Sequence, residues 1–197
     1  MVNQLTQKLR IARLLASRDM DAFTELIAES QSRVRTFLVR LCRDYDLADD
    51  LAQDTFITAY QKLASFKGSG SFEGWLCKIA FNRFLQYKRD DKRKQEILAQ
   101  YEQVLEVESN RYDSVTDIQI ELEKAFSALN HGEAAAITLC HSFGFSHQEV
   151  ASILNAPLGT VKSQIKRGKQ KLKDALTPAH VHEHEWGNEK ADRKVAL

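Results

Sequence analysis

The spacing of apolar residues constrains the fold of this chain more than any other feature. Apolar side chains recur at three- and four-residue steps over 21–43, 46–66 and 72–89, which predicts three amphipathic helices. A shorter stretch of the same kind, 5–16, precedes them, and Asp21 is the predicted N-cap of the first of the three. Only two Pro and eight Gly interrupt 197 residues, and no segment alternates with the period of a strand. We therefore predict an all-α fold.

A second helical group is predicted from about Thr116 to Leu176, with breaks at 130–132, at Gly144 and at 155–157. Between the two groups the chain becomes acidic, with six Asp or Glu against one Arg, as is typical of a flexible linker. After the second group no apolar stripe continues, which predicts a frayed tail. The predicted bounds are 1–94 and 118–177 for the two domains, 95–117 for the linker and 178–197 for the tail.

The most specific signal is a helix-turn-helix pattern in FSHQEVASILNAPLGTVKSQIKRGKQKLKDAL, residues 145–176. Ser146 and Glu149 form a capping box that starts a short helix. Asn155 then begins a tight turn, and Pro157 suits the first turn of the next helix, where its missing N–H costs nothing. Two short helices joined in this way place the second helix in the major groove of DNA.

The second helix of this pattern has one cationic face. Between residues 158 and 173 there are six Lys or Arg and no acid, and Val161, Ile165 and Leu172 share the apolar side. Lys and Arg neutralise phosphates, while Arg and Gln also bind base edges. The alternative is an amphipathic surface helix with a solvated Lys face. The residues on the outer side and its flanks are Thr160, Lys162, Ser163, Lys166, Arg167, Gln170 and Lys173.

Five aspartates lie within 44–54, a stretch without Lys or Arg. The spacings 46/50 and 50/54 place carboxylates on one helical face, where they repel each other. Three interpretations compete. The cluster is a solvated helix start favoured by the macrodipole, a divalent-metal site of a hydrolase, although it lacks an adjacent His or Glu, or a docking surface for a basic partner.

The third helix combines basic, amide and aromatic side chains. Over 78–94 it holds seven Lys or Arg against two Asp, and Phe81 and Leu85 lie among them. This mixture suits single-stranded nucleic acid, whose bases stack and whose phosphates are neutralised. The small, polar loop 67–71 before it can approach an unpaired base closely. The alternative for Phe81 and Leu85 is a helix that is packed on two sides, with both residues in the core.

Three motifs in this order resemble the sigma-70 family, in its extracytoplasmic-function group. DAFTELIAESQSRVRTFLVRLCRDYDLADDLAQDTFITAYQKLASFKG is similar to region two, SFEGWLCKIAFNRFLQYKR is similar to the segment that follows it, and FSHQEVASILNAPLGTVKSQIKRGKQKL is similar to region four. The resemblance covers roughly 10–93 and 120–176. It implies two helical domains and a role in promoter selection.

The resemblance also implies which residues bind each partner. Those implied to dock on core RNA polymerase are Asp46, Asp49, Asp50, Leu51, Gln53, Asp54 and Phe56. Those implied to bind the minus-ten element, by capturing a flipped non-template base and holding the opened strand, are Lys67, Gly68, Ser69, Ser71, Trp75, Lys78, Asn82 and Arg83. Those implied to bind the minus-thirty-five element are Thr160, Lys162, Ser163, Lys166 and Arg167.

On the same resemblance we expect a cytoplasmic protein that makes and breaks no bonds, needs no cofactor or metal, and is restrained by an anti-sigma factor. The sequence departs from the family at Gln164, Gly168 and 130–133, so no promoter sequence carries over. The tail adds His180, His182 and His184, for which a solvated tail and a transition-metal site are both open interpretations.

The charge balance, the apolar runs and the cysteines exclude several other classes. The net charge is +1, no apolar run is long enough for a membrane span, and the N-terminus has no signal-peptide pattern. Three Cys far apart argue against a disulfide framework or a thiolate zinc site. Two competing functions remain: a stand-alone helix-turn-helix regulator, and a metal-dependent nuclease that uses the aspartates.

Overall fold

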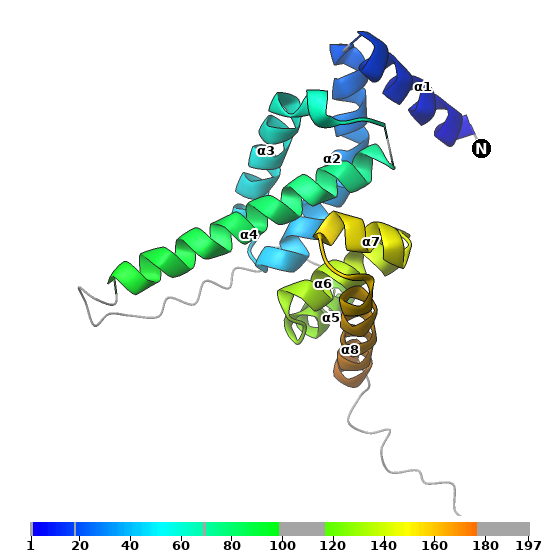
Figure 1. The fold of residues 1–197 in the computed structure, drawn as a ribbon. Helices are drawn as coiled ribbons and strands as arrows, with labels where there is room; N and C mark the ends of the chain where they lie inside the picture. The colour runs from blue at the N-terminus through cyan, green and yellow to red at the C-terminus, as the bar shows by residue number, and fades with distance from the viewer. Residues whose placement is uncertain (1, 18, 69, 99–116, 177–197) are drawn as a thin grey trace, which may run out of the picture.

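The computed structural model describes residues 2–17, 19–68, 70–98 and 117–176, and in this part of the chain every regular element is a helix (Figure 1). The α-helices are α1 (Val2–Ser17), α2 (Met20–Cys42), α3 (Tyr45–Gln61), α4 (Phe72–Leu98), α5 (Asp117–Ser127), α6 (His131–Ile137), α7 (His147–Leu154) and α8 (Leu158–Leu176). A 3-10 turn covers Leu63–Ser65 and a π-helical turn covers Thr138–Ser142. The prediction of an all-α fold is confirmed.

The N-terminal group, α1–α4, packs around large apolar side chains. α2 contacts α1, α3 and α4. Phe37 of α2 and Phe72 and Phe84 of α4 are among the largest fully buried side chains. The predicted N-cap of α2, Asp21, is wrong by two residues, because the helix begins earlier. The Asp19 carboxylate accepts hydrogen bonds from the backbone amides of Asp21 at 3.0 Å and Ala22 at 3.1 Å.

The C-terminal group, α5–α8, is a small bundle in which α8 contacts α5, α6 and α7. The predicted capping box is confirmed, since Ser146 and Glu149 satisfy each other's backbone amides at the start of α7. Asn155 ends α7 in the left-handed conformation, with φ of 50°. Pro157 immediately precedes the first residue of α8, so the tight turn of the predicted helix-turn-helix is present.

The two groups lie directly against each other. α6 and the π-helical turn pack on α2, and α7 packs on α4 (Figure 1). Phe143 lies 6.3 Å from Phe37, measured between ring centroids, and His131 meets Phe84 edge-on at 5.0 Å. Phe81 is buried and also contacts Phe37, which favours its interpretation as a core residue, whereas Leu85 is exposed.

Two arginines of α2, Arg33 and Arg40, and the C-cap residue of α2, Arg43, line this contact. Arg33 donates to the Phe143 carbonyl at 3.3 Å and lies 4.8 Å above the Phe143 ring. Arg40 donates to Ser142 Oγ at 2.6 Å and lies over the ring of Phe126. Arg43 donates to the carbonyls of Phe126 and Leu129, just before α6. Cationic and aromatic groups therefore join α2 to the C-terminal group over most of its second half.

His131 makes this contact sensitive to pH. Its Nδ1 lies 3.1 Å from the Leu41 carbonyl and therefore donates to it. Burial and the nearby charges of Lys88 and Arg43 lower the pKa of His131 below its usual value of about 6.5. A lowered histidine pKa means that the folded state disfavours the proton, so stability is full above pH of about 6.5 and declines below it.

We therefore expect the thermal unfolding midpoint to fall between pH of about 7 and 5, and to fall less in His131→Gln, which cannot titrate there. The midpoint is measured by circular dichroism as a function of pH. His147→Gln, which removes an exposed imidazole at the start of α7, is the control. Identical pH profiles for His131→Gln and the unmodified chain would contradict the prediction.

Candidate nucleic-acid interface

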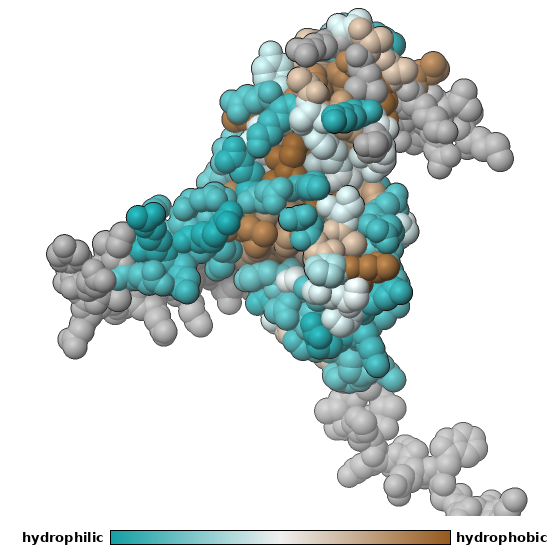
Figure 2. Space-filling view, viewed as in Figure 1, coloured by the Kyte–Doolittle hydropathy of each residue, from teal (hydrophilic) through white to brown (hydrophobic). Residues whose placement is uncertain are grey.

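In α8, the residues predicted to bind the minus-thirty-five element lie on the side opposite the buried apolar residues, as the helical periodicity predicts. Val161, Ile165 and Gly168 are buried against the rest of the C-terminal group. Thr160, Lys162, Lys166 and Arg167 are exposed on the other side, and Ser163 is half-buried, donating to the Thr160 carbonyl at 2.8 Å. Figure 2 shows hydrophilic residues covering the part of the molecule where α8 lies. The arrangement is a cationic helical face with an apolar back, which fits a DNA groove.

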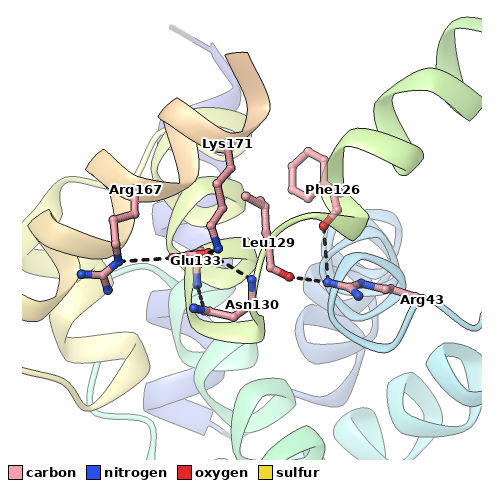
Figure 3. A network of polar contacts seen from close by, with 7 residues as sticks. All are labelled: Arg43, Phe126, Leu129, Asn130, Glu133, Arg167 and Lys171. Carbon is pink, nitrogen blue, oxygen red and sulfur yellow. Dashed lines mark hydrogen bonds and ion pairs between the residues drawn. The ribbon is translucent and has the colours of Figure 1, made fainter. Parts of the chain in front are cut away.

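A buried carboxylate lies behind this face. Glu133 of α6 is 1% exposed, and it accepts from Arg167 Nε at 3.2 Å and from Lys171 Nζ at 2.8 Å (Figure 3). Burial alone would raise the pKa of this carboxyl, but hydrogen bonds from Lys171, the Asn130 amide and Arg167 hold the pKa below its usual range. Sequence reasoning missed Glu133. The signal was present, because Asn130 and Glu133 have the spacing of a capping box, which the structure contains.

The residues that depart from the family pattern, Gln164, Gly168 and 130–133, lie where α6 packs on α8. A Cβ on Gly168 would lie 2.9 Å from Ile137 Cγ1, and a Cβ on Gly132 would collide with the Gln164 side-chain amide. Gln164 is half-buried and faces α6 rather than the outer side of α8. Gly168 thus allows a close approach of α8 to α6, whereas at Gly132 a Cβ would displace the flexible end of the Gln164 side chain. These departures concern packing within the C-terminal group.

The loop before α4 and the first turn of α4 are built by a cap and an aromatic cluster. Ser71 Oγ accepts from the Gly74 amide at 2.9 Å, so Ser71 caps the helix. Trp75 is half-buried and lies 5.2 Å from Phe66 and 5.5 Å from Phe72, between ring centroids. Lys67 is exposed, Gly68 has φ of 72°, and Ser69 lies outside the described residues.

Farther along α4 the predicted minus-ten residues differ in their surroundings. Asn82 is exposed and Lys78 is half-buried. Arg83 points to α3, where its Nε and a terminal nitrogen donate to Thr58 Oγ1 at 2.9 and 2.5 Å. The cations from Lys88 to Lys94 are exposed on the half of α4 that extends away from the other helices (Figure 1). Arg83 therefore holds α4 to α3, while Asn82 is open to a ligand.

The aspartates of α3 fall into two sets. Asp44 caps the helix, and Asp49 binds Arg35 of α2 through two hydrogen bonds, at 2.5 and 3.0 Å. The others, with Gln53, face solvent, whereas Leu51 is buried and Phe56 is half-buried. The solvent-facing carboxylates are those of Asp46, Asp50 and Asp54. The exposed side of α3 is therefore acidic, and the side that packs on the other helices is apolar.

Within the described ranges, no group of three His, Cys, Asp or Glu is arranged to hold a metal ion. The predicted histidine site of the tail lies outside those ranges. The three cysteines are free, and burial raises the pKa of the Cys42 thiol to about 12, so this thiol stays protonated at neutral pH. Among the same residues, no helix combines the length and apolar character of a membrane span.

Two family models match the chain: Sigma-70 region 2 over residues 26–94 and Sigma-70, region 4 over residues 119–172. The chain is 30% identical over 189 residues to the ECF RNA polymerase sigma-E factor of Haemophilus influenzae, covering 90% of this chain and 99% of that one. It is 33% identical over 161 residues to the ECF RNA polymerase sigma factor SigE of Mycolicibacterium smegmatis, covering 80% of this chain and 62% of the relative.

Two solved structures share the fold. The sigma factor RpoE in complex with the anti-sigma factor NepR, from Bartonella quintana, matches with a TM-score of 0.65 and 29% identity, over 78% of this chain and 96% of that one. CnrH in complex with the cytosolic domain of CnrY matches with a TM-score of 0.59 and 25% identity, over 85% of this chain and 96% of that one.

Proposed function

This chain belongs to the extracytoplasmic-function (ECF) group of the sigma-70 family, and on that premise we propose how its surfaces divide the work of a sigma factor. As such a factor it binds core RNA polymerase and directs promoter recognition, melting and transcription initiation. The acidic face of α3 docks on the polymerase, the loop 67–71 with α4 binds the minus-ten element, and α8 binds the minus-thirty-five element.

The cationic face of α8 is the observation that carries this proposal. It belongs to a capped helix-turn-helix, its apolar side is buried, and Lys162 and Lys166 are exposed on it. Lysines in this position neutralise phosphates and fix the register of the helix on the duplex, while Thr160, Ser163 and Arg167 contribute hydrogen bonds.

Promoter melting is assigned to α4 and the loop before it. Capture of unpaired bases offsets their unstacking cost, which is a few kcal/mol. Lys67 and Asn82 are exposed and available for such contacts. Trp75 is held in the aromatic cluster with Phe66 and Phe72, which supports a role in shaping the site, and Arg83 contributes by fixing α4 on α3.

The remaining assignments follow from the family. We propose domains at 1–94 and 118–177 joined by the linker 95–117, which threads through core polymerase. The start of α5 at Asp117 supports the second bound, whereas α4 continues to Leu98, so the first residues of the proposed linker are helical. The protein acts in the cytoplasm without catalysing a reaction of its own. The matched RpoE structure contains the anti-sigma factor NepR, which supports an anti-sigma factor for this protein as well.

Run-off transcription with purified core RNA polymerase tests the proposal. The full chain is expected to start RNA synthesis at defined sites on genomic DNA fragments from its source, and polymerase without it is not. Failure at every fragment, with polymerase that responds to another sigma factor, would overturn the proposed function.

The chain alone is expected to bind promoter DNA weakly. Its cationic surfaces are small and separate, and fixing both groups on polymerase raises the effective concentration of the second contact once the first has formed. A mobility-shift titration of one active promoter, with and without core enzyme, measures the difference, which we expect to be about 100-fold or more. Tight, sequence-specific binding by the chain alone would contradict this prediction.

A further inference from the structure

We infer that Glu133 is a positioning residue for promoter recognition: it holds the Arg167 side chain so that the terminal guanidinium nitrogens are presented to the minus-thirty-five DNA. The inference rests on the proposed function of α8 and extends it to a residue of α6. It assigns the buried acid a role in promoter selectivity in addition to its role in the capping box of α6.

The Glu133 carboxylate is held rigidly. It is 1% exposed, and its Oε2 accepts from the Asn130 amide at 3.1 Å and from Lys171 Nζ at 2.8 Å. The Asn130 side chain in turn accepts from the Glu133 amide at 2.9 Å. Because both ends of the side chain are constrained, the second oxygen, Oε1, is a fixed acceptor that points at α8 (Figure 3).

Arg167 uses one nitrogen for this contact. Its Nε donates to Glu133 Oε1 at 3.2 Å, while the side chain as a whole remains 57% exposed. Figure 3 shows the rest of the guanidinium lying on the side away from Glu133. A guanidinium has five N–H donors, so four of them stay available at the two terminal nitrogens. These are the nitrogens that bind a phosphate or the O6 and N7 of guanine in pairs.

Holding Arg167 in this way favours binding, because an arginine that is already ordered loses less side-chain entropy when it meets the DNA. Lys171 differs from Arg167 in this respect. It lies one turn farther along α8, it is less exposed, and its ammonium, which is a single compact charge, lies against Glu133. Lys171 thus compensates the buried charge, and Arg167 is the residue that extends from the carboxylate to the outer face.

The main alternative is that the ion pair between Glu133 and Arg167 weakens DNA binding. If Glu133 withdrew Arg167 from the DNA, removal of the carboxylate charge would free the arginine and strengthen binding. The two possibilities predict changes of opposite sign, so a substitution that keeps the capping box and removes the charge separates them.

The experiment uses the full chain with core RNA polymerase. The unmodified holoenzyme first selects its preferred sites from a DNA library randomised over the minus-thirty-five element, and discrimination is the ratio of open-complex formation on a selected site to that on a scrambled one. Glu133→Gln keeps an amide oxygen for the capping box. We expect it to lower discrimination about 10-fold, as the loss of one good bidentate contact does.

Arg167→Ala and the double variant show whether Glu133 acts through Arg167. Arg167→Ala is expected to lose about the same 10-fold, and Glu133→Gln added to it is expected to change discrimination by less than about 2-fold, because coupled residues are not additive. Glu149→Gln is the matched control, since Glu149 occupies the same capping position in α7 and its side chain accepts hydrogen bonds from Ser146. It is expected to keep full discrimination.

Arg167→Lys provides a variant that leaves Glu133 paired with Lys171 and does not endanger the fold. A lysine has one ammonium group for two partners, so this variant is also expected to lose discrimination about 10-fold. Unchanged or increased discrimination in Glu133→Gln, full discrimination in Arg167→Lys, or additive losses in the double variant would each overturn the inference. Failure of the unmodified chain to select any site would instead overturn the proposed function.

Discussion

Changing Asp50 and Asp54 to Lys is expected to lower the affinity for core RNA polymerase about 100-fold or more. Both carboxylates are exposed on α3, one turn apart, above the buried Leu51. A basic docking surface that faces two lysines instead of two carboxylates experiences repulsion of several kcal/mol, and each 1.4 kcal/mol is a factor of ten in the dissociation constant. Affinity is measured by competition of labelled chains for core enzyme.

The fold is expected to survive this change, because neither residue caps a helix or binds Arg35, as Asp44 and Asp49 do. Unfolding curves check this point. Asp90→Lys reverses an exposed acid on α4, outside the proposed docking face, and is expected to leave the affinity for polymerase within about 2-fold. Normal assembly of Asp50→Lys/Asp54→Lys with core enzyme would show that α3 does not form the docking surface.

Changing Lys162 and Lys166 to Glu is expected to lower transcription from promoters that depend on the minus-thirty-five element about 100-fold. The two lysines lie one turn apart on the exposed side of α8. Each loses a phosphate contact and places a negative charge against the DNA backbone, and the salt dependence of binding should also become less steep by about two counterions. Initial rates of run-off transcription at several salt concentrations measure both effects.

Lys124→Glu reverses an exposed lysine of α5, in the same helical group but outside α8, and serves as the control. It is expected to transcribe like the unmodified chain. The double variant should still bind core polymerase, because α3 is unchanged. Equal transcription by Lys162→Glu/Lys166→Glu and the control would remove α8 from the proposed DNA surface.

Local features of the fold were predictable from the sequence. The helices, the capping box at Ser146 and the turn at Asn155 follow from residues within a few positions of each other. The N-cap of α2 was misplaced because both Asp19 and Asp21 have the chemistry of a cap, and only the start of the helix decides between them. The outer face of α8 was also predictable, since helical periodicity alone separates Lys162 and Lys166 from Val161 and Ile165.

Contacts between residues far apart in the chain were not predictable in this way. Arg33 and Arg40 look like ordinary surface cations of α2, and nothing nearby indicates that their partners are Phe143 and Ser142, more than 100 residues later. The same reason applies to the hydrogen bond from Arg83 of α4 to Thr58 of α3, which no local pattern indicates. The expected role of Arg83 at the minus-ten element stays a prediction. Periodicity shows which side of a helix is polar, but not which distant polar group it meets.

The direct packing of the C-terminal group on α2 and α4 has a consequence for the spacing between the two promoter elements. The minus-ten and minus-thirty-five elements are about 25 base pairs apart, or about 85 Å of duplex at 3.4 Å per base pair. Two bodies in contact cannot reach sites so distant, since even the 27-residue α4 is only about 40 Å long. We therefore expect the two groups to separate when they bind the polymerase. The spacing tolerated between the two elements would then be set by the polymerase and not by the contact between the groups.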